Sequence, residues 1–487
     1  MADIKEIFKG DDATVIISEL KKGRQAAEPN IELYVSQINP YKHNVFDKEK
    51  RPDKKVRVSN PQSDKKALQV TKSDSSNEGS FKYVPVARVA LAIQKLIVKR
   101  AVAFTFGNPV MLNCEPKNDA EAAVLKAVNA VLFDTKARSL NRQIAREIFS
   151  ATETAELWYP VEKPANYGFQ SKFKLRTAIF SVEKGDKLFP YFDPTGDMVA
   201  FSREYQIEDQ TKNKKRYFET YTDTEHYIWV YGGDNWTLLD GYPKNNAIGK
   251  IPVIYGAQPN VEWADVQVLI ERLETLLSNF SDTNDYHAAP KIIVKGKIKG
   301  FAEKGETGAI LQLEGDNPDA RYLEWSQAPE SVRLEIDTLL RMIYTITQTP
   351  DISFDTVKGI GAVSGIALKL LFMDAHLKVQ EKMEIFDDYL QRRISIIKSF
   401  LAQMNVADKN FVSACNSLII EPEIKPFMIE DENAKIQLLI SANGGKAIIS
   451  QKTSIQQAGV VNDADKEFKQ IQKESQSRQS NAQNQTK

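Results

Sequence analysis

The feature that most constrains the fold is a long helical stretch, residues 329–404, that contains one break. In its first part, apolar residues recur at three- and four-residue steps from Val332 to Ile346, and charged residues occupy the opposite side. This spacing predicts an amphipathic helix over residues 329–348. A helix that buries one apolar stripe needs a partner surface, so this stretch already implies a large helical core or an assembly of helices.

The break covers residues 349–363. Pro350 disfavours a helical conformation at Thr349, and Gly359 and Gly361 weaken any helix that follows. Ser364 is the expected N-cap of a second helix, which meets no proline and no internal glycine up to Met404 and so extends over roughly 40 residues, about 60 Å. Two interpretations stay open, a helical hairpin within a core and two helices joined by a functional loop.

The overall composition limits the class of protein. The chain has 487 residues, enough for roughly two to four domains, and its 65 basic and 65 acidic side chains cancel. A protein that binds nucleic acid tightly through phosphates carries an excess of positive charge. The balance therefore argues against a tight DNA binder but allows transient contact with DNA.

Cysteines and hydropathy indicate the compartment. Cys114 and Cys415 are the only cysteines, which excludes a disulfide framework or a four-thiolate zinc site and fits a reducing compartment. The N-terminal residues lack the pattern of a signal peptide, and no apolar run approaches the length of about 18 residues that a membrane span needs. We expect a protein of the cytoplasm with no membrane contact.

Taken in order, the chain predicts an α+β body. Residues 1–80 are predicted to form a peripheral arm and a flexible loop, because a short amphipathic start is followed by a charged, proline-containing stretch. Further along, the pattern predicts helices over 86–106, 119–136 and 139–154, and then strands over 174–182, 198–205, 217–222 and 225–231, with a hairpin at 232–235 leading into Trp236.

A strict seam follows this body. Trp263, Val266, Ile270, Leu273 and Leu277 alternate at three- and four-residue steps on a predicted helix over 262–286. Such a seam suits packing between helices of neighbouring subunits or burial within one domain, and the pattern does not decide between them. Short strands with frequent glycines between this helix and the next predict a small β module over 289–328.

The C-terminal part is predicted to contain a strand over 417–421 and helices over 430–442, 450–458 and 464–474. The last residues are rich in Gln, Ser and Asn and are predicted to be disordered.

No motif points to a catalytic, cofactor or metal site. Gly444 to Lys446 resembles the end of a phosphate-binding loop, but Ala447 replaces the hydroxyl residue that binds Mg²⁺. Residues 282–285 fail as a calcium loop at the later ligand positions, and the four histidines are scattered. An enzyme stays possible at this point, because a pair of catalytic carboxylates cannot be recognised in one sequence.

Four stretches together resemble a known family. They are residues 89–110, which end in a Phe-Gly-Asn-Pro-Val turn; 249–255 with the helix 263–281 and residues 282–285; 348–354 with 364–369; and 449–454 with 463–474. In this order the chain resembles the portal (head-to-tail connector) proteins of tailed bacteriophages, in their siphophage-like branch. The resemblance covers about residues 81–475.

The resemblance implies a ring, usually of twelve subunits, with the portal fold. It implies a wing at 81–256 and 405–428, stem helices at 257–288 and 329–348, a β clip at 289–328, a tunnel loop at 349–363, a long helix at 364–404, a helical crown at 429–475 and a disordered tail at 476–487. Residues 1–80 exceed a short portal, and their contacts stay open.

The implied function is a non-enzymatic conduit for double-stranded DNA during packaging and ejection, in the virion at one capsid vertex, assembled in the host cytoplasm. The implied partners are other copies of the chain, DNA in transit, the terminase large subunit, the major capsid and scaffolding proteins and a head-completion or adaptor protein. The alternatives are a packaging-associated enzyme or unrelated hydrolase, and a helical scaffold or adaptor protein.

Three groups of residues follow as candidates for these contacts. In the loop, Asp351 and Asp355 offset the charge of Lys358, which predicts weak and movable contact with DNA. The DNA-facing loop comprises Asp351, Ile352, Ser353, Phe354, Asp355, Thr356, Val357 and Lys358; the clip contact comprises Lys291, Lys295, Lys297 and Lys299; the stem seam comprises Trp263, Val266, Ile270, Leu273 and Leu277.

Overall fold

The computed structural model of the chain describes residues 4–57, 81–208, 212–287, 292–298, 313–322, 328–351, 372–427, 432–444, 447–461 and 464–485. These residues form two compact units, Met1–Thr349 with Leu377–Pro426 and Pro350–His376 with Phe427–Lys487. Helices and strands are mixed in the larger unit, so the predicted α+β class is confirmed.

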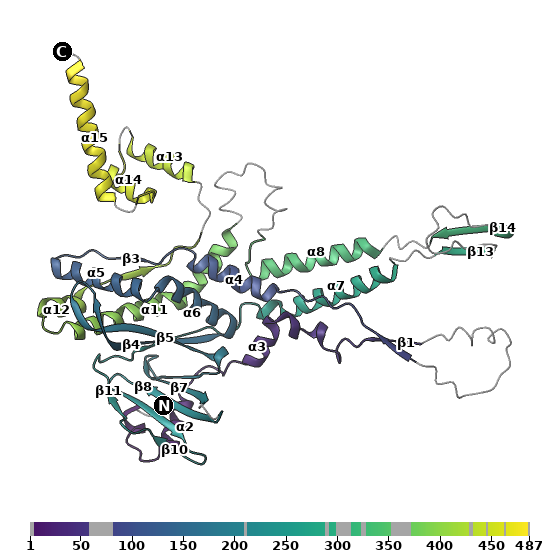
Figure 1. The fold of residues 1–487 in the computed structure, drawn as a ribbon, viewed down its shortest axis with the longest axis horizontal. Coiled ribbons are helices and arrows are strands. Elements are labelled where there is room, and N and C mark those ends of the chain that lie inside the picture. The colour runs from purple at the N-terminus through teal and green to yellow at the C-terminus, as the bar shows by residue number, and fades with distance from the viewer. Residues whose placement is uncertain are drawn as a thin grey trace. The chain divides into compact units, whose positions relative to one another are not determined.

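A three-stranded antiparallel sheet lies at the centre of the larger unit (Figure 1). Its order is β12 (Val253–Ala257), β4 (Glu153–Asn166) and β5 (Gln170–Ser181). The helix before β4 was predicted to continue to residue 154, but it ends at Ala151 because Thr152 adopts a left-handed conformation, φ 69°, and donates its N–H to the Ile148 carbonyl at 2.9 Å.

Helices cover one face of this sheet (Figure 1). The covering helices are α4 (Ile93–Phe106), α5 (Asp119–Asp134), α6 (Ala137–Ala151) and α11 (Met373–Met404). The buried Glu156 of β4 accepts hydrogen bonds from Arg393 Nε at 3.0 Å and from the Tyr389 hydroxyl at 3.1 Å, both on α11. Arg393 also donates to Asn141 of α6, so one ion pair joins the sheet to two helices.

The prediction that α4 starts at Val86 is wrong, and a neighbouring helix explains why. Backbone N–H groups of Ala87, Val89 and Leu91 donate to side chains of α7 (Gln267–His287) at 2.8–2.9 Å. Because those donors are bound by Asp282, Ser278 and Glu274, the segment stays extended until Ile93.

A six-stranded sheet packs against the other face of the three-stranded one. Its path is β10 (Trp236–Leu238), β9 (Glu225–Tyr231), β8 (Lys214–Tyr221), β7 (Met198–Glu208) and β6 (Lys187–Phe192), and β11 (Lys244–Asn245) pairs with β9. Phe180, Phe201 and Tyr221 lie in the buried cluster between the two sheets. The predicted strand over 225–231 and the hairpin into Trp236 are confirmed.

The N-terminal residues do not form the predicted peripheral arm. They form α1 (Ile4–Ile7), α2 (Ala13–Lys22), α3 (Ile31–Ile38) and the short helices η1 (Pro40–Lys42) and η2 (Asn44–Phe46). Ile17 and Leu20 of α2 are buried against Phe218 and Trp229 of the six-stranded sheet. The core of this sheet therefore includes part of the segment predicted to be a peripheral arm, whereas most of the predicted flexible loop, residues 58–80, lies outside the described residues.

The larger unit also contains two long helices, α7 and α8, and two two-stranded ribbons. They are α7, preceded by η4 (Ala264–Val266), and α8 (Ala328–Ile346), with β13 (Ile292–Ile298) paired to β14 (Leu313–Tyr322) between them; β1 (Lys54–Arg57) pairs with β2 (Phe81–Val84). The remaining elements are η3 (Val182–Lys184), β3 (Met111–Asn113), α12 (Lys409–Ser417) and β15 (Glu421–Glu423), which pairs with β3. The predicted strand over 417–421 is wrong, because Asp408 caps α12, which extends to Ser417.

The seam on α7 is buried within the chain itself. Trp263, Val266, Ile270 and Leu273 are fully covered, and Leu277 is half-buried. The Trp263 indole donates to Gln37 Oε1 at 3.0 Å, so even its polar atom has an internal partner. Of the two readings of this seam, the structure supports burial within one domain.

The smaller unit contains α13 (Glu432–Asn443), α14 (Gln451–Ala458) and α15 (Ala464–Gln485). The C-terminal tail was predicted to be disordered, yet α15 continues to Gln485, since no proline or glycine interrupts it. The long helix expected from Gly365 begins at Met373, and residues 364–371 lie outside the described residues. Among the helices described, none combines the length and the apolar composition needed to cross a membrane.

We predict that Leu20→Ala lowers the free energy of unfolding by about 2–5 kcal/mol, because it leaves a cavity beneath the six-stranded sheet. Chemical denaturation measures the loss. Val15→Ala on the same helix is the matched control, since Val15 is 57% exposed, and we expect a change within about 0.5 kcal/mol. Equal effects of the two substitutions would contradict the packing of α2.

Candidate functional site

The end of α8 is shaped by three residues in sequence. Thr347 donates its hydroxyl to the Ile343 carbonyl at 2.7 Å, and Gln348 adopts a left-handed conformation, φ 49°. The Thr349 N–H then bonds back to the Tyr344 carbonyl at 2.9 Å. Pro350 follows and has no N–H to continue the helix, so the chain leaves α8 at a defined point.

The beginning of α11 is tied to the same point. Lys378 donates from Nζ to the Thr347 carbonyl at 3.0 Å, and the lysine is only 8% exposed. A cation suits this place, because the last carbonyls of a helix carry partial negative charge. The two ends of the segment 350–376 are thus held together by a direct side-chain contact.

A buried carboxylate holds this contact in place. Glu262, just before η4, binds Lys378 Nζ at 2.6 Å and Lys382 Nζ at 2.8 Å, and its side chain is 3% exposed. Lys382 also donates to Gln258 Oε1 at 3.3 Å, and the Glu262 N–H donates to the Phe149 carbonyl at 3.1 Å. We call Glu262, Lys378, Lys382 and the Thr347 carbonyl the loop anchor.

The protonation of the loop anchor follows from its charges. Burial alone would raise the pKa of Glu262, but the positive charges of Lys378 and Lys382 lower it below its usual value. Burial alone would lower the pKa of Lys382, and the charge of Glu262 raises it overall. The carboxylate and the ammonium therefore both stay charged near neutral pH, and the anchor is a permanent ionic junction rather than an acid or a base for catalysis.

The sequence-predicted loop lies next to this anchor. Asp351 is half-buried, and residues 352–358 lie outside the described residues, as do Lys291 and Lys299 of the predicted clip contact. Lys295 is exposed on β13 directly opposite Asp319 of β14, and Lys297 lies on the same strand.

Sequence reasoning missed the anchor itself. Lys378 and Lys382 are four residues apart, so they share one face of α11, but lysines at that spacing usually mark an exposed face. Glu262 gives no pattern at all. Only its position immediately before the apolar seam that starts at Trp263 could have drawn attention to it.

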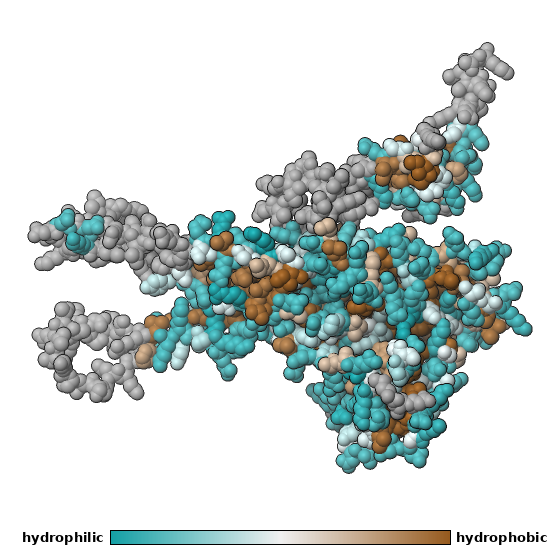
Figure 2. Space-filling model, turned by 180° about the vertical axis from the view of Figure 1, so that it is seen from behind, coloured by the Kyte–Doolittle hydropathy of each residue, from teal (hydrophilic) through white to brown (hydrophobic). Residues whose placement is uncertain are grey.

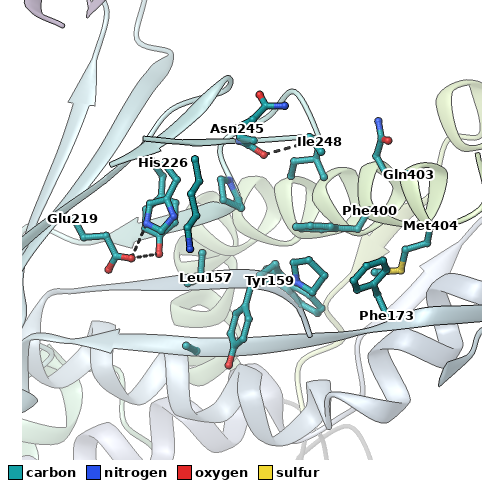
Figure 3. Close-up of a pocket in the computed structure, with 18 of the residues that line it drawn as sticks. Leu157, Tyr159, Phe173, Glu219, His226, Asn245, Ile248, Phe400, Gln403 and Met404 are labelled. Carbon is teal, nitrogen blue, oxygen red and sulfur yellow. Dashed lines mark hydrogen bonds and ion pairs between the residues drawn. The ribbon is translucent and has the colours of Figure 1, made fainter. Parts of the chain in front are cut away.

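A pocket of about 1070 Å³ opens elsewhere in the larger unit, between the two sheets and the end of α11 (Figure 3). Its floor includes Leu157, Phe173 and Phe400, and Glu219 and His226 lie at one end. Glu219 accepts hydrogen bonds or ion pairs from Arg203 at 2.6 Å, the Tyr221 hydroxyl at 2.6 Å and His226 Nε2 at 2.8 Å.

Those partners decide what Glu219 can do. Burial by itself raises the pKa of Glu219, but the hydrogen bond from His226, the charge of Arg203 and the hydrogen bond from Tyr221 lower it overall. The carboxylate is ionised, and both its oxygens are already engaged. It therefore joins strands β7, β8 and β9 and is not available as a general acid.

The comparison with protein families decides what this architecture belongs to. The family model described as "Phage portal protein, SPP1 Gp6-like" matches residues 47–481. The chain belongs to this family. It is therefore a structural, non-enzymatic portal protein of the virion, located at the portal vertex of the capsid. The resemblance seen in the sequence is confirmed, and the enzyme alternative is wrong.

Two solved particle necks are also similar to the chain. The neck of an empty GTA particle, computed with C6 symmetry, matches with 12% identity and a TM-score of 0.41 over 76% of this chain and 89% of that chain. The neck of a native GTA particle, computed with C12 symmetry, matches with 12% identity and a TM-score of 0.38 over 76% and 88%. The family assignment rests on the family match alone. No curated protein matches the chain.

We predict that Glu262→Gln lowers the free energy of unfolding by about 3–5 kcal/mol, because two buried lysines lose their counter-charge. Chemical denaturation checks the loss. Glu381→Gln is the matched control, since Glu381 contacts the same Lys382 at 3.3 Å but its side chain is 65% exposed. Similar losses of unfolding free energy for the two variants would contradict the stabilising role of the buried Glu262 carboxylate.

The ion pairs of Glu262 with Lys378 and Lys382 also predict how stability depends on pH. The folded-state pKa of Glu262 lies below its usual value, so its stabilisation is present above the unfolded-state pKa and is lost as pH falls through the folded one. Below about pH 4.5 the parent protein should therefore lose stability more steeply than Glu262→Gln does. Denaturation curves at several acidic pH values measure the two slopes, and parallel slopes would contradict the assignment.

Proposed function

We propose that this portal protein assembles into a ring around a central channel at one capsid vertex, and that double-stranded DNA passes through the channel during packaging and ejection. The ring also docks the terminase large subunit, the head-completion or adaptor protein and the capsid and scaffolding proteins. Membership of the portal family supports this proposal, and twelve subunits is the expected number.

The observation that carries the mechanism is the loop anchor. Both ends of the segment 350–376 are fixed by contacts among Thr347, Lys378 and Glu262, which are all buried or nearly so. Because the residues that flank this segment are held together, the segment starts and ends at one place on the larger unit. A loop that faces a channel needs such an attachment. We assign the DNA-facing role to residues 351–358, as their sequence predicts.

The charge of the chain suits passage rather than retention of DNA. Each fixed contact between a lysine or arginine and a phosphate adds affinity that a packaging motor must overcome. The anchor lysines are buried and both bind Glu262, so they hold the protein together instead of offering exposed cations. A net charge of zero over the chain agrees with weak contact.

The elements suit the subdomains of the family. In this proposal the two sheets with α4, α5, α6 and α12 form the wing, α7 and α8 form the stem, β13 and β14 form the clip, and α13, α14 and α15 form the crown. The exposed Lys295 on β13 supports a clip surface that meets the motor or the head-completion protein. The burial of Trp263 to Leu273 within the chain means that other side chains of α7 and α8 must form any contact between stems.

The test is electron microscopy of the purified chain followed by a packaging assay. We expect rings with a central hole wide enough for DNA, and we expect that deletion of residues 351–361 leaves the rings intact but abolishes packaging. The control is an equally long deletion of residues 477–487, which should keep both properties.

Two outcomes would overturn the proposal. A chain that stays monomeric under all assembly conditions, or forms particles without a DNA-wide channel, would instead favour a scaffold or adaptor. Normal packaging by the loop deletion would remove the loop from the mechanism while leaving the ring.

A further inference from the structure

The ribbon of β1 and β2 is not stable by its own contacts. It has only two strands, and the side chains of Lys54–Val56 and of Phe81–Val84 are exposed. Isolated two-stranded ribbons are marginal in water. Yet this one presents apolar side chains, with Val56 40%, Phe81 52% and Tyr83 68% exposed. Such a surface calls for a partner.

The base of the ribbon is firmly attached to α7. Asp282 of α7 accepts from Arg51 at 2.8 Å and from the Ala87 N–H at 2.8 Å, and Arg88 pairs with Asp53 at 2.8 Å. The ribbon therefore leaves the larger unit at a defined place beside α7 (Figure 1). Because its base is fixed while its strands are bare, its partner lies outside the described part of this chain.

The charge of the ribbon indicates the chemistry of that partner. Its strands contain Lys54, Lys55, Arg57 and Lys82 and no acidic residue. Lys55 Nζ lies 4.3 Å from the centre of the Phe81 ring, so basic and apolar groups share one surface. The complementary surface carries acidic side chains beside exposed apolar ones.

The helical pair α7 and α8 offers such a surface. Val268 is 76% exposed on α7, and Leu334 and Met342 are 67% and 51% exposed on α8. Figure 2 shows apolar side chains both on the ribbon and over this pair of helices. Glu274 of α7 is buried, and Asp282 is already bound by Arg51 of the same chain. The other acidic residues of the two helices still outnumber the basic ones: Glu271, Asp285, Glu330, Glu335 and Asp337 against Arg272, Arg333 and Arg341.

We infer that in the ring the β1–β2 ribbon of each subunit lies against the α7–α8 pair of the neighbouring copy. The inference rests on the proposed ring, in which a head-to-tail contact repeats around the axis. The same chain's α7–α8 pair does not cover the ribbon, since the side chains of Lys54–Val56 and Phe81–Val84 stay exposed in the single chain. This contact joins the α7–α8 pairs of neighbouring subunits through the ribbon, and it buries Phe81 and Tyr83.

Disulfide trapping tests the contact in the full chain. Cys114 and Cys415 are first replaced by Ser and Ala, and one preparation then carries Tyr83→Cys while another carries Val268→Cys, Leu334→Cys or Met342→Cys. Mixed rings, oxidised mildly, should yield a covalent dimer on a non-reducing gel with at least one of the three partners. Leu238→Cys in place of Tyr83→Cys is the control, because Leu238 is also exposed, at 41%, but lies on β10; it should give none.

A second measurement tests the charge. Lys55→Glu with Lys82→Glu should reduce the fraction of protein in rings at least several-fold, and adding Glu330→Lys with Asp337→Lys should restore it. All these residues are exposed, so the variants should fold like the parent, which far-UV circular dichroism checks.

The outcomes separate this inference from the proposed function. If the parent protein forms no ring, the proposed function fails. If rings form but none of the three partners is trapped, or if only intramolecular bonds form when both cysteines are in one chain, the inferred contact is wrong and the ring stands. Trapping of Tyr83 by another particle protein instead of a second copy would also overturn it.

Discussion

The structure depends on two buried carboxylates that bind one face of α11. Glu262 holds Lys378 and Lys382, and Glu156 holds Arg393. Breaking a buried pair on one side leaves a charge without compensation, which is far more harmful than never having buried the pair. The two carboxylates therefore fix the register of α11 against the three-stranded sheet, because a shift by one turn would bury cations without partners.

This register also determines the position of the residues that flank the segment 350–376. Lys378 also binds the Thr347 carbonyl at the end of α8, so the position of α11 sets where the segment 350–376 leaves and re-enters the body. A movement that separated Thr347 from Lys378 would have to break this junction. The contact therefore fixes the end of α8 relative to α11.

The sequence predicted the elements whose stability is local and failed where other segments decide the outcome. The spacing from Val332 to Ile346 suffices for α8, and the turn at 232–235 suffices for the hairpin into Trp236. The extended conformation before Ile93, in contrast, follows from side chains of α7 that lie far away in sequence. The loop anchor was missed for a related reason. Lys378 and Lys382, four residues apart, suggest an exposed helix face, and only the position of Glu262 in the folded chain shows that this face is buried.

The N-terminal residues show that α7 is also held by contacts with segments far away in sequence. Residues before 47 lie outside the family match, yet His43 binds Glu274 of α7 at 2.7 Å through Nδ1 and the Gln37 carbonyl at 2.6 Å through Nε2. Asp282 receives Arg51 on the same helix. Because Glu274 and Asp282 lie at two points along α7, and Glu262 anchors the residues just before η4, the helix is fixed along its length within one chain.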